Sequence, residues 1–88
     1  MNLLILDYGS GNIKSVYNSL KFVLDKIDKR YEIIVSNSTK DISKSDFIIL
    51  PGVGSFQHCK ESIFKYVGLF DALYENVLIK SKPFLGIC

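Results

Sequence analysis

Residues 47–56 read FIILPGVGSF, an isoleucine-rich apolar run that meets a proline and then two glycines. A short, unbroken apolar run bounded by turn residues predicts a strand buried on both faces, as strands are in a parallel sheet. Proline and glycine directly after it predict a tight turn, because proline fixes one backbone angle and glycine accepts positive ones. The stretch therefore indicates a parallel strand that ends at a glycine-rich loop.

Three further runs have the same apolar character. They are Leu-Leu-Ile-Leu at 3–6, Ile-Ile-Val at 33–35 and Phe-Leu-Gly-Ile at 84–87, and each has the length of a strand. Between the first two, apolar residues recur at helical spacing, which predicts an amphipathic helix of about four turns. Its apolar positions are Ile13, Val16, Tyr17, Leu20, Val23, Leu24 and Ile27. Ser10 or Asn12 is placed to cap its beginning.

Helical spacing returns over residues 55–80, with a predicted interruption at Gly68. The positions expected to face the core there are Phe56, Cys59, Ile63, Val67, Phe70, Leu73 and Val77. Residues 38–44, STKDISK, are expected to be a short connector between the second and third strands. Strands that alternate with helices predict a three-layer α/β fold, in which right-handed crossovers lay the strands parallel.

Composition excludes several classes of function. The 88 residues are 48% apolar and 23% charged, with a net charge of +2 and no block of like charge, so no nucleic-acid-binding surface is predicted. No apolar stretch approaches the roughly 20 residues that span a bilayer, and the beginning lacks the basic region of a signal peptide. Two cysteines make no disulfide framework, which predicts reduced thiols in the cytoplasm. The lysines, Lys82 included, are expected on solvated faces.

Three unusual stretches fall at the carboxyl ends of predicted strands. DYGSGN at 7–12 follows the first strand, PGVGSF at 51–56 follows the third, and Cys88 ends the fourth. The carboxyl ends of parallel strands share one edge of the sheet, and ligands bind in the crevice outside that edge. We therefore expect two glycine-rich loops and a thiol along the same edge.

Cys88 has two interpretations. Cysteine is among the most buried residue types, so Cys88 can be a small apolar residue of the core. Alternatively, its place at the tip of a parallel strand, two residues after Gly86, matches half of a nucleophile elbow, the strained strand-to-helix turn that exposes a nucleophile. A helix beginning after it would favour the thiolate. The residues alone leave both interpretations open.

The two loops are weaker signals. PGVG at 51–54 is most simply a tight turn, although its uncovered backbone N–H groups could also stabilise an oxyanion. DYGSGN is neither a dinucleotide fingerprint, since Lys14 occupies the third glycine position, nor a Walker A loop. His58, the single histidine, is expected on a helix rather than as a catalytic base, and Cys59 is expected in the core.

Together, LLILDYGSGNIKSV at 3–16, FIILPGVGSF at 47–56 and KPFLGIC at 82–88 closely resemble the class I glutamine amidotransferase family. The resemblance covers all 88 residues in matching order, but less than half of the family's domain. The Asp-Tyr-Gly-x-Gly-Asn-Ile beginning and PGVG are similar to the branch whose glutaminase subunit passes ammonia to a cyclase subunit in histidine biosynthesis. The resemblance implies a flavodoxin-like fold truncated after the fourth strand, with residues 1–88 as the N-terminal part of a single domain.

The resemblance also implies roles for individual residues. Cys88 matches the nucleophile that attacks the side-chain amide of glutamine, and Gly52, Val53 and Gly54 match the oxyanion loop. Asn12 matches the rim that faces the cyclase, a (β/α)8 barrel, in a heterodimer. The family's catalytic His and Glu match nothing in these residues, so the 88 residues alone are expected to be inactive. Neither a cofactor nor a metal is implied.

Two other functions stay open at this point. One is another cysteine-dependent protein of the wider amidotransferase-like group, such as its protease-like or chaperone-like branch. The other is a non-catalytic flavodoxin-like module that binds a phosphate at GSGN, residues 9–12. A continuation of the chain with the elbow's second glycine after Cys88 would favour the amidotransferase.

Overall fold

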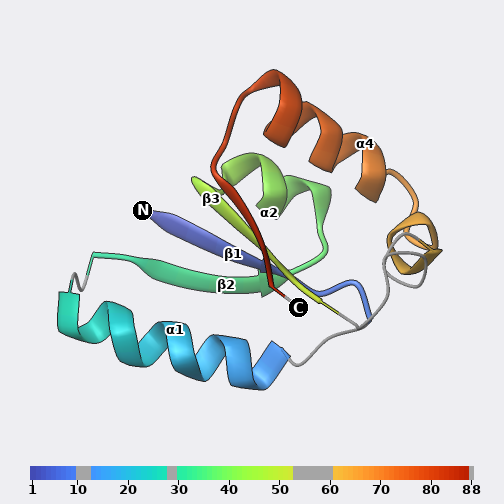
Figure 1. Ribbon diagram of the computed structural model, residues 1–88. Helices are drawn as coiled ribbons and strands as arrows, with labels where there is room; N and C mark the ends of the chain where they lie inside the picture. Colours follow the sequence, from blue (N-terminus) through green and yellow to red (C-terminus); the bar gives the residue numbers. More distant parts are fainter. Residues whose placement is uncertain (10–12, 28–29, 53–60, 88) are drawn as a thin grey trace.

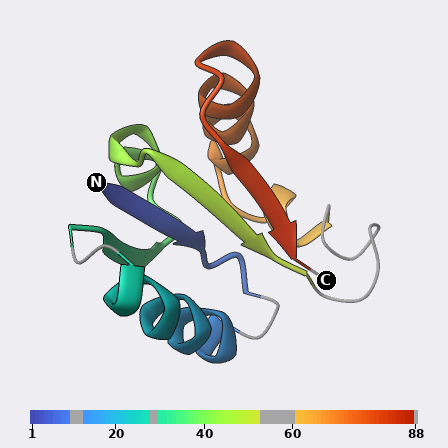
Figure 2. The same ribbon diagram turned by 60° about the vertical axis from the view of Figure 1, so that its left-hand side comes forward.

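The computed structural model describes residues 1–9, 13–27, 30–52 and 61–87. Within these ranges, four strands form one parallel sheet in the order β2-β1-β3-β4 (Figure 1, Figure 2). The strands are β1 (Asn2–Leu6), β2 (Glu32–Ser36), β3 (Phe47–Pro51) and β4 (Phe84–Ile87). All four strands predicted from the apolar runs are confirmed.

The central position of β1 explains its sequence. Leu4 pairs with Ile34 of β2 on one side and with Ile48 of β3 on the other. A central parallel strand is covered on both faces, so the whole run from residue 3 to residue 6 is apolar and buried. By contrast, Leu85 on β4 is 48% exposed, because no other described strand pairs with the far side of β4.

Helices cover both faces of the sheet, as expected for a three-layer α/β fold (Figure 1). Helix α1 (Ile13–Ile27) packs against the face that holds the odd-numbered residues of β1. Helices α2 (Thr39–Lys44) and α4 (Leu69–Leu73) contribute to the core over the even-numbered residues. The division follows from the strand geometry, in which successive side chains point to opposite faces.

The chain reverses its direction of travel across the sheet at β1. It passes from β1 through α1 to β2 on one side, and then through α2 to β3 on the other side. The adjacent strands β1 and β3 therefore feed helices on opposite faces, which makes their carboxyl ends the topological switch point of the sheet. This order is that of flavodoxin-like sheets, so the predicted fold class is confirmed.

Helix α1 has the predicted extent and most of the predicted apolar face. Val16, Leu20 and Leu24 pack against the sheet, whereas Val23 is 46% exposed and Ile27 is 74% exposed. A helix of 15 residues is about 22 Å long and a strand of five residues about 17 Å, so the last helical turn extends past the sheet. The core-facing prediction is therefore wrong for Ile27, and it is also wrong for Val23.

Residues 38–44, expected as a connector, contain a helix. In α2, Ile42 is fully buried and is the one large apolar residue of the six, which leaves no helical periodicity to detect. Short side chains fix its beginning: the Ser36 hydroxyl donates to Asp41 Oδ2 at 2.6 Å and accepts the Ser38 N–H at 3.0 Å. The first turn of α2 is thus specified by serine and aspartate rather than by burial.

The predicted interruption at Gly68 is confirmed. Gly68 has a φ of 78°, in the left-handed region, and it separates a helical turn at residues 61–64 from α4. Helix α4 runs directly into η1 (Tyr74–Ile79), a π-helical turn. These breaks shift the helical phase, so Val67 is fully exposed and Phe70 is 45% exposed. Both were expected to face the core, and that expectation is wrong. The buried apolar residues of this region are Ile63, Leu69 and Leu73.

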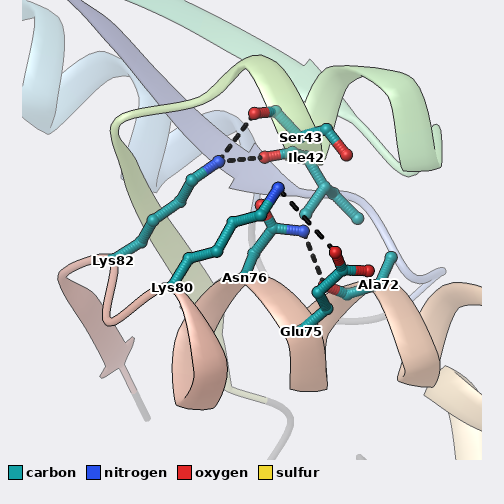
Figure 3. A network of polar contacts seen from close by, with 7 residues as sticks. All are labelled: Ile42, Ser43, Ala72, Glu75, Asn76, Lys80 and Lys82. Carbon is teal, nitrogen blue, oxygen red and sulfur yellow. Dashed lines mark hydrogen bonds and ion pairs between the residues drawn. The ribbon is translucent and has the colours of Figure 1, made fainter.

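Lys82 fastens the segment before β4 to helix α2 (Figure 3). Its ammonium donates to the carbonyl oxygens of Ile42 at 3.0 Å and Ser43 at 2.7 Å, near the carboxyl end of α2. Cations are favourable at that end of a helix, where carbonyl groups lack intrahelical partners. Lys82 was expected on a solvated face; its side chain is half-buried, and its ammonium also joins two elements.

Candidate active site

The three stretches that the sequence singles out have described residues at the carboxyl edge of the sheet. Residues 7–9 follow β1, Gly52 follows β3, and Ile87 ends β4. Ile87 pairs with Pro51 in the register of β3 and β4. The ends of three neighbouring strands therefore lie level at the switch point, where α/β folds bind their ligands.

Tyr8 connects two of these strand ends. Its side chain is 1% exposed, within the core formed with α2 and α4. Its hydroxyl donates a hydrogen bond to the carbonyl oxygen of Pro51, which is also buried. A buried tyrosine usually has a partner for its hydroxyl, and here the partner is the last residue of β3. Tyr8 thus holds the DYG segment against the beginning of the PGVG loop.

The sequence interpretation missed Tyr8. The prediction for DYGSGN rested on its glycines and assigned no role to the tyrosine. A usable signal was present, because an aromatic residue with one polar atom directly follows a strand predicted to be buried. Such a residue is suited to contribute its ring to the core and its hydroxyl to the edge of the sheet.

Gly9 is required by the local geometry. Its φ is 84°, and its N–H donates to the Asp7 carboxylate at 3.3 Å. A Cβ atom at this position would lie 3.2 Å from the hydroxyl of Tyr66, which belongs to the segment before α4. The loop after β1 therefore turns in a left-handed conformation beneath that hydroxyl, which L residues with side chains adopt only at a cost.

Gly52 lies within the described part of the predicted oxyanion loop. It is half-buried and directly follows β3. The other predicted site residues, Asn12, Val53, Gly54 and Cys88, lie outside the described residues, as do His58 and Cys59. Their roles therefore remain predictions.

The described residues contain neither a candidate metal site nor a candidate membrane-spanning helix. No group of three or more His, Cys, Asp or Glu side chains in these ranges is arranged to hold a metal ion. Among the same residues, no helix combines the length and the apolar character that crossing a membrane requires.

No family model matches the chain. The HisH subunit of imidazole glycerol phosphate synthase from Pelagibacter ubique is 44% identical over 89 residues, and the match covers 100% of this chain and 41% of that protein. The HisH subunit from Rhodospirillum rubrum is 35% identical over 88 residues, with the same coverage of both chains. The chain is a relative of the HisH subunits.

A third relative extends this finding. The HisH 2 subunit of Pseudomonas aeruginosa is 43% identical over 86 residues, which are 98% of this chain and 39% of that protein. The resemblance inferred from the three sequence motifs is thus confirmed over the whole chain. The chain spans about two fifths of the length of these relatives and matches their N-terminal part.

Proposed function

We propose that the chain supplies the N-terminal part of a class I glutaminase subunit, which releases ammonia from glutamine for imidazole glycerol phosphate synthase in histidine biosynthesis. The observation that carries the proposal is the similarity of all 88 residues to HisH subunits. The edge geometry supports it. Cys88 follows Ile87 in the sequence, and Ile87 pairs with Pro51 at the beginning of the PGVG loop.

The proposed reaction begins at Cys88. Its thiolate forms a bond to the side-chain amide carbon of glutamine, and the carbonyl electron pair moves to oxygen. Backbone N–H groups of Gly52, Val53 and Gly54 stabilise this oxyanion. When the carbonyl re-forms, the C–N bond breaks, and the leaving group takes a proton and departs as ammonia. Water then hydrolyses the γ-glutamyl thioester to glutamate.

The proposal includes a partner and a place of action. A cyclase subunit with a (β/α)8 barrel receives the ammonia, and the rim around Asn12 faces it in a heterodimer. The catalytic histidine and glutamate are supplied by the part of the domain that these 88 residues do not match. The reaction needs no cofactor or metal and takes place in the cytoplasm, where thiols stay reduced.

The test is a chimera in which residues 1–88 replace the matching segment of the Pelagibacter ubique HisH subunit, assayed with that organism's cyclase. Cys88→Ala should abolish glutamine-dependent turnover and leave turnover with free ammonia nearly intact, because only amide hydrolysis needs the thiol. The matched control is Cys59→Ala, at the other cysteine, which should keep both activities. Glutamine-dependent turnover in Cys88→Ala would refute the assignment.

A further inference from the structure

One side of the helical segment formed by α4 and η1 carries large apolar residues at a regular spacing. Phe70, Tyr74 and Leu78 recur every four residues, so they lie on one side of the segment. They are 45%, 51% and 66% exposed, respectively. The ring of Phe64 extends the row, because it stacks on the ring of Phe70. These four residues form the α4–η1 stripe.

The stripe faces away from α2. Gly68 and Ala72 line a groove that α4 shares with α2. Residues two apart on an α-helix point about 200° apart, in nearly opposite directions, so Phe70 and Tyr74 face the other way. Helix α2 contacts β1 and β2, which lie on one side of β3 in the sheet. The stripe is therefore directed toward the other side, where β4 is the last of the described strands.

The sheet is also incompletely covered on that side. Phe84 of β4 pairs with Ile48 of β3, and Ile48 belongs to the core on the face of α2 and α4. Paired residues of neighbouring strands point to the same face, so Phe84 lies on that face as well. Its side chain is 40% exposed. Phe84 and the stripe thus leave apolar surface open on the same face and toward the same edge of the described sheet (Figure 2).

The course of the chain indicates what would cover this surface. The chain runs from β2 through α2 to β3 and from β3 through α4 to β4, so both helices lie on one face while the chain advances in one direction. Connections between parallel strands are right-handed and usually helical. A further strand beyond β4 would consequently be reached through a helix on this same face, beside α4. The Rhodospirillum rubrum and Pelagibacter ubique subunits have the length for it, because the match covers 41% of each.

We propose that the α4–η1 stripe and Phe84 form the docking surface for an amphipathic helix from the part of the domain that these 88 residues do not match. The proposal rests on the proposed glutaminase function, since that function requires the remainder of the domain. Side chains four apart form a ridge that fits between the side chains of a second helix. The facing helix must present apolar residues, because the surface contains no charged side chain. Docking removes from water a surface that otherwise promotes association.

The test measures whether this surface is covered in the chimera. Leu78→Cys and Ile27→Cys place thiols at positions that are 66% and 74% exposed in the 88 residues, in a background with Cys59→Ala and Cys88→Ala. Ile27, at the end of α1, is the matched control. Iodoacetamide alkylates the thiols, and peptide mass spectrometry follows the rate at each position. Leu78→Cys should react at least about tenfold more slowly than Ile27→Cys, because a covered thiol reacts only after local opening.

A second matched pair keeps the test decisive where one variant does not fold. Tyr74, on the stripe, is 51% exposed, and Val23, on α1, is 46% exposed. Tyr74→Cys should be protected relative to Val23→Cys to the same extent. Protection should persist without the cyclase and over about a hundredfold range of protein concentration, because the covering helix is part of the same domain and its docking does not depend on mass action.

Any other result would overturn the docking surface. Equal rates within each pair would show that the stripe stays exposed. Protection that appears only with the cyclase would assign the surface to that subunit, and protection that appears only at high concentration would assign it to a second copy. Failure of the proposed function is recognised separately, by a parent chimera that releases no ammonia from glutamine, whereas the alkylation rates require no activity.

Discussion

Gly9 illustrates how a single residue sets the course of a loop. Its φ of 84° lies in the region that favours glycine, and the Tyr66 hydroxyl closes the space where a side chain would start. The sequence predicted a glycine-rich turn here, but it gave no means to distinguish a glycine needed for space from one that is incidental. That distinction depends on Tyr66, which is 57 positions away in the sequence.

We expect Gly9→Ala in the chimera to reduce the free energy of unfolding by about 1–2 kcal/mol, the cost of a left-handed conformation for a residue with a Cβ. Tyr66 must also move, because the added carbon would lie 3.2 Å from its hydroxyl. Gly86→Ala is the control, since no atom lies within 4 Å of its Cβ position and its φ is not positive. Urea unfolding of both variants decides the question, and equal losses would show that the conformation of Gly9 is not the cause.

At the scale of elements, the sequence predicted best those elements that are buried. The runs that became β1 and β3 are buried, and their apolar character is visible without a structure. Helix α2 was missed because its first turn depends on the hydrogen bonds of Ser36 and its burial on one isoleucine. The apolar face of residues 61–79 was misplaced because one left-handed glycine and one π-helical turn change the phase, and periodicity assumes a regular helix.

The hydrogen bonds of the Lys82 ammonium connect the segment before β4 to α2. They predict unequal effects for substitutions of two neighbouring lysines. Lys82→Met keeps most of the side chain but removes the bonds to Ile42 and Ser43, so it should cost about 1 kcal/mol of stability. Lys80→Met removes an exposed ion pair with Glu75 of 3.9 Å and should cost about 0–0.5 kcal/mol. Thermal unfolding of the two variants measures the difference. A larger loss of stability for Lys80→Met would contradict a stabilising role for the Lys82 hydrogen bonds to α2.

The contribution of Lys82 to stability also depends on pH, and the sign of this dependence is defined. Burial, and next the charge of Lys80, lower the pKa of Lys82 below its ordinary value of 10.5, while Asp46 acts in the opposite direction. In the pH range just below 10.5 the unfolded chain therefore binds more protons at this position than the folded chain. The stability of the parent should rise relative to Lys82→Met as the pH rises through that range. A difference that falls with rising pH would show that the folded state favours the charged form.

At the scale of the whole molecule, the described surface has many large apolar residues. The ring of Phe64, in the helical turn before α4, stacks on that of Phe70 of α4 with 4.8 Å between centroids, and the Tyr74 ring of η1 lies 6.4 Å from Phe70. All three are about half exposed, and Leu78 and Ile79 are more than 60% exposed. On β4, Leu85 is 48% exposed at an edge of the described sheet. Apolar surface of this kind promotes association, and an exposed strand edge adds a template for pairing.

These features predict the behaviour of residues 1–88 expressed alone. The polypeptide should melt broadly, bind a dye specific for exposed apolar surface and associate at micromolar concentration, as partly molten states do. It should also release no ammonia from glutamine. The 88 residues hold no match to the catalytic His and Glu, and a thiol with an ordinary pKa near 8.5 is only a few per cent thiolate at neutral pH. Calorimetry, light scattering and an ammonia assay give the answer. A sharp melt from a monomer would contradict the structural expectation, and turnover lost in Cys88→Ala would contradict the chemical one.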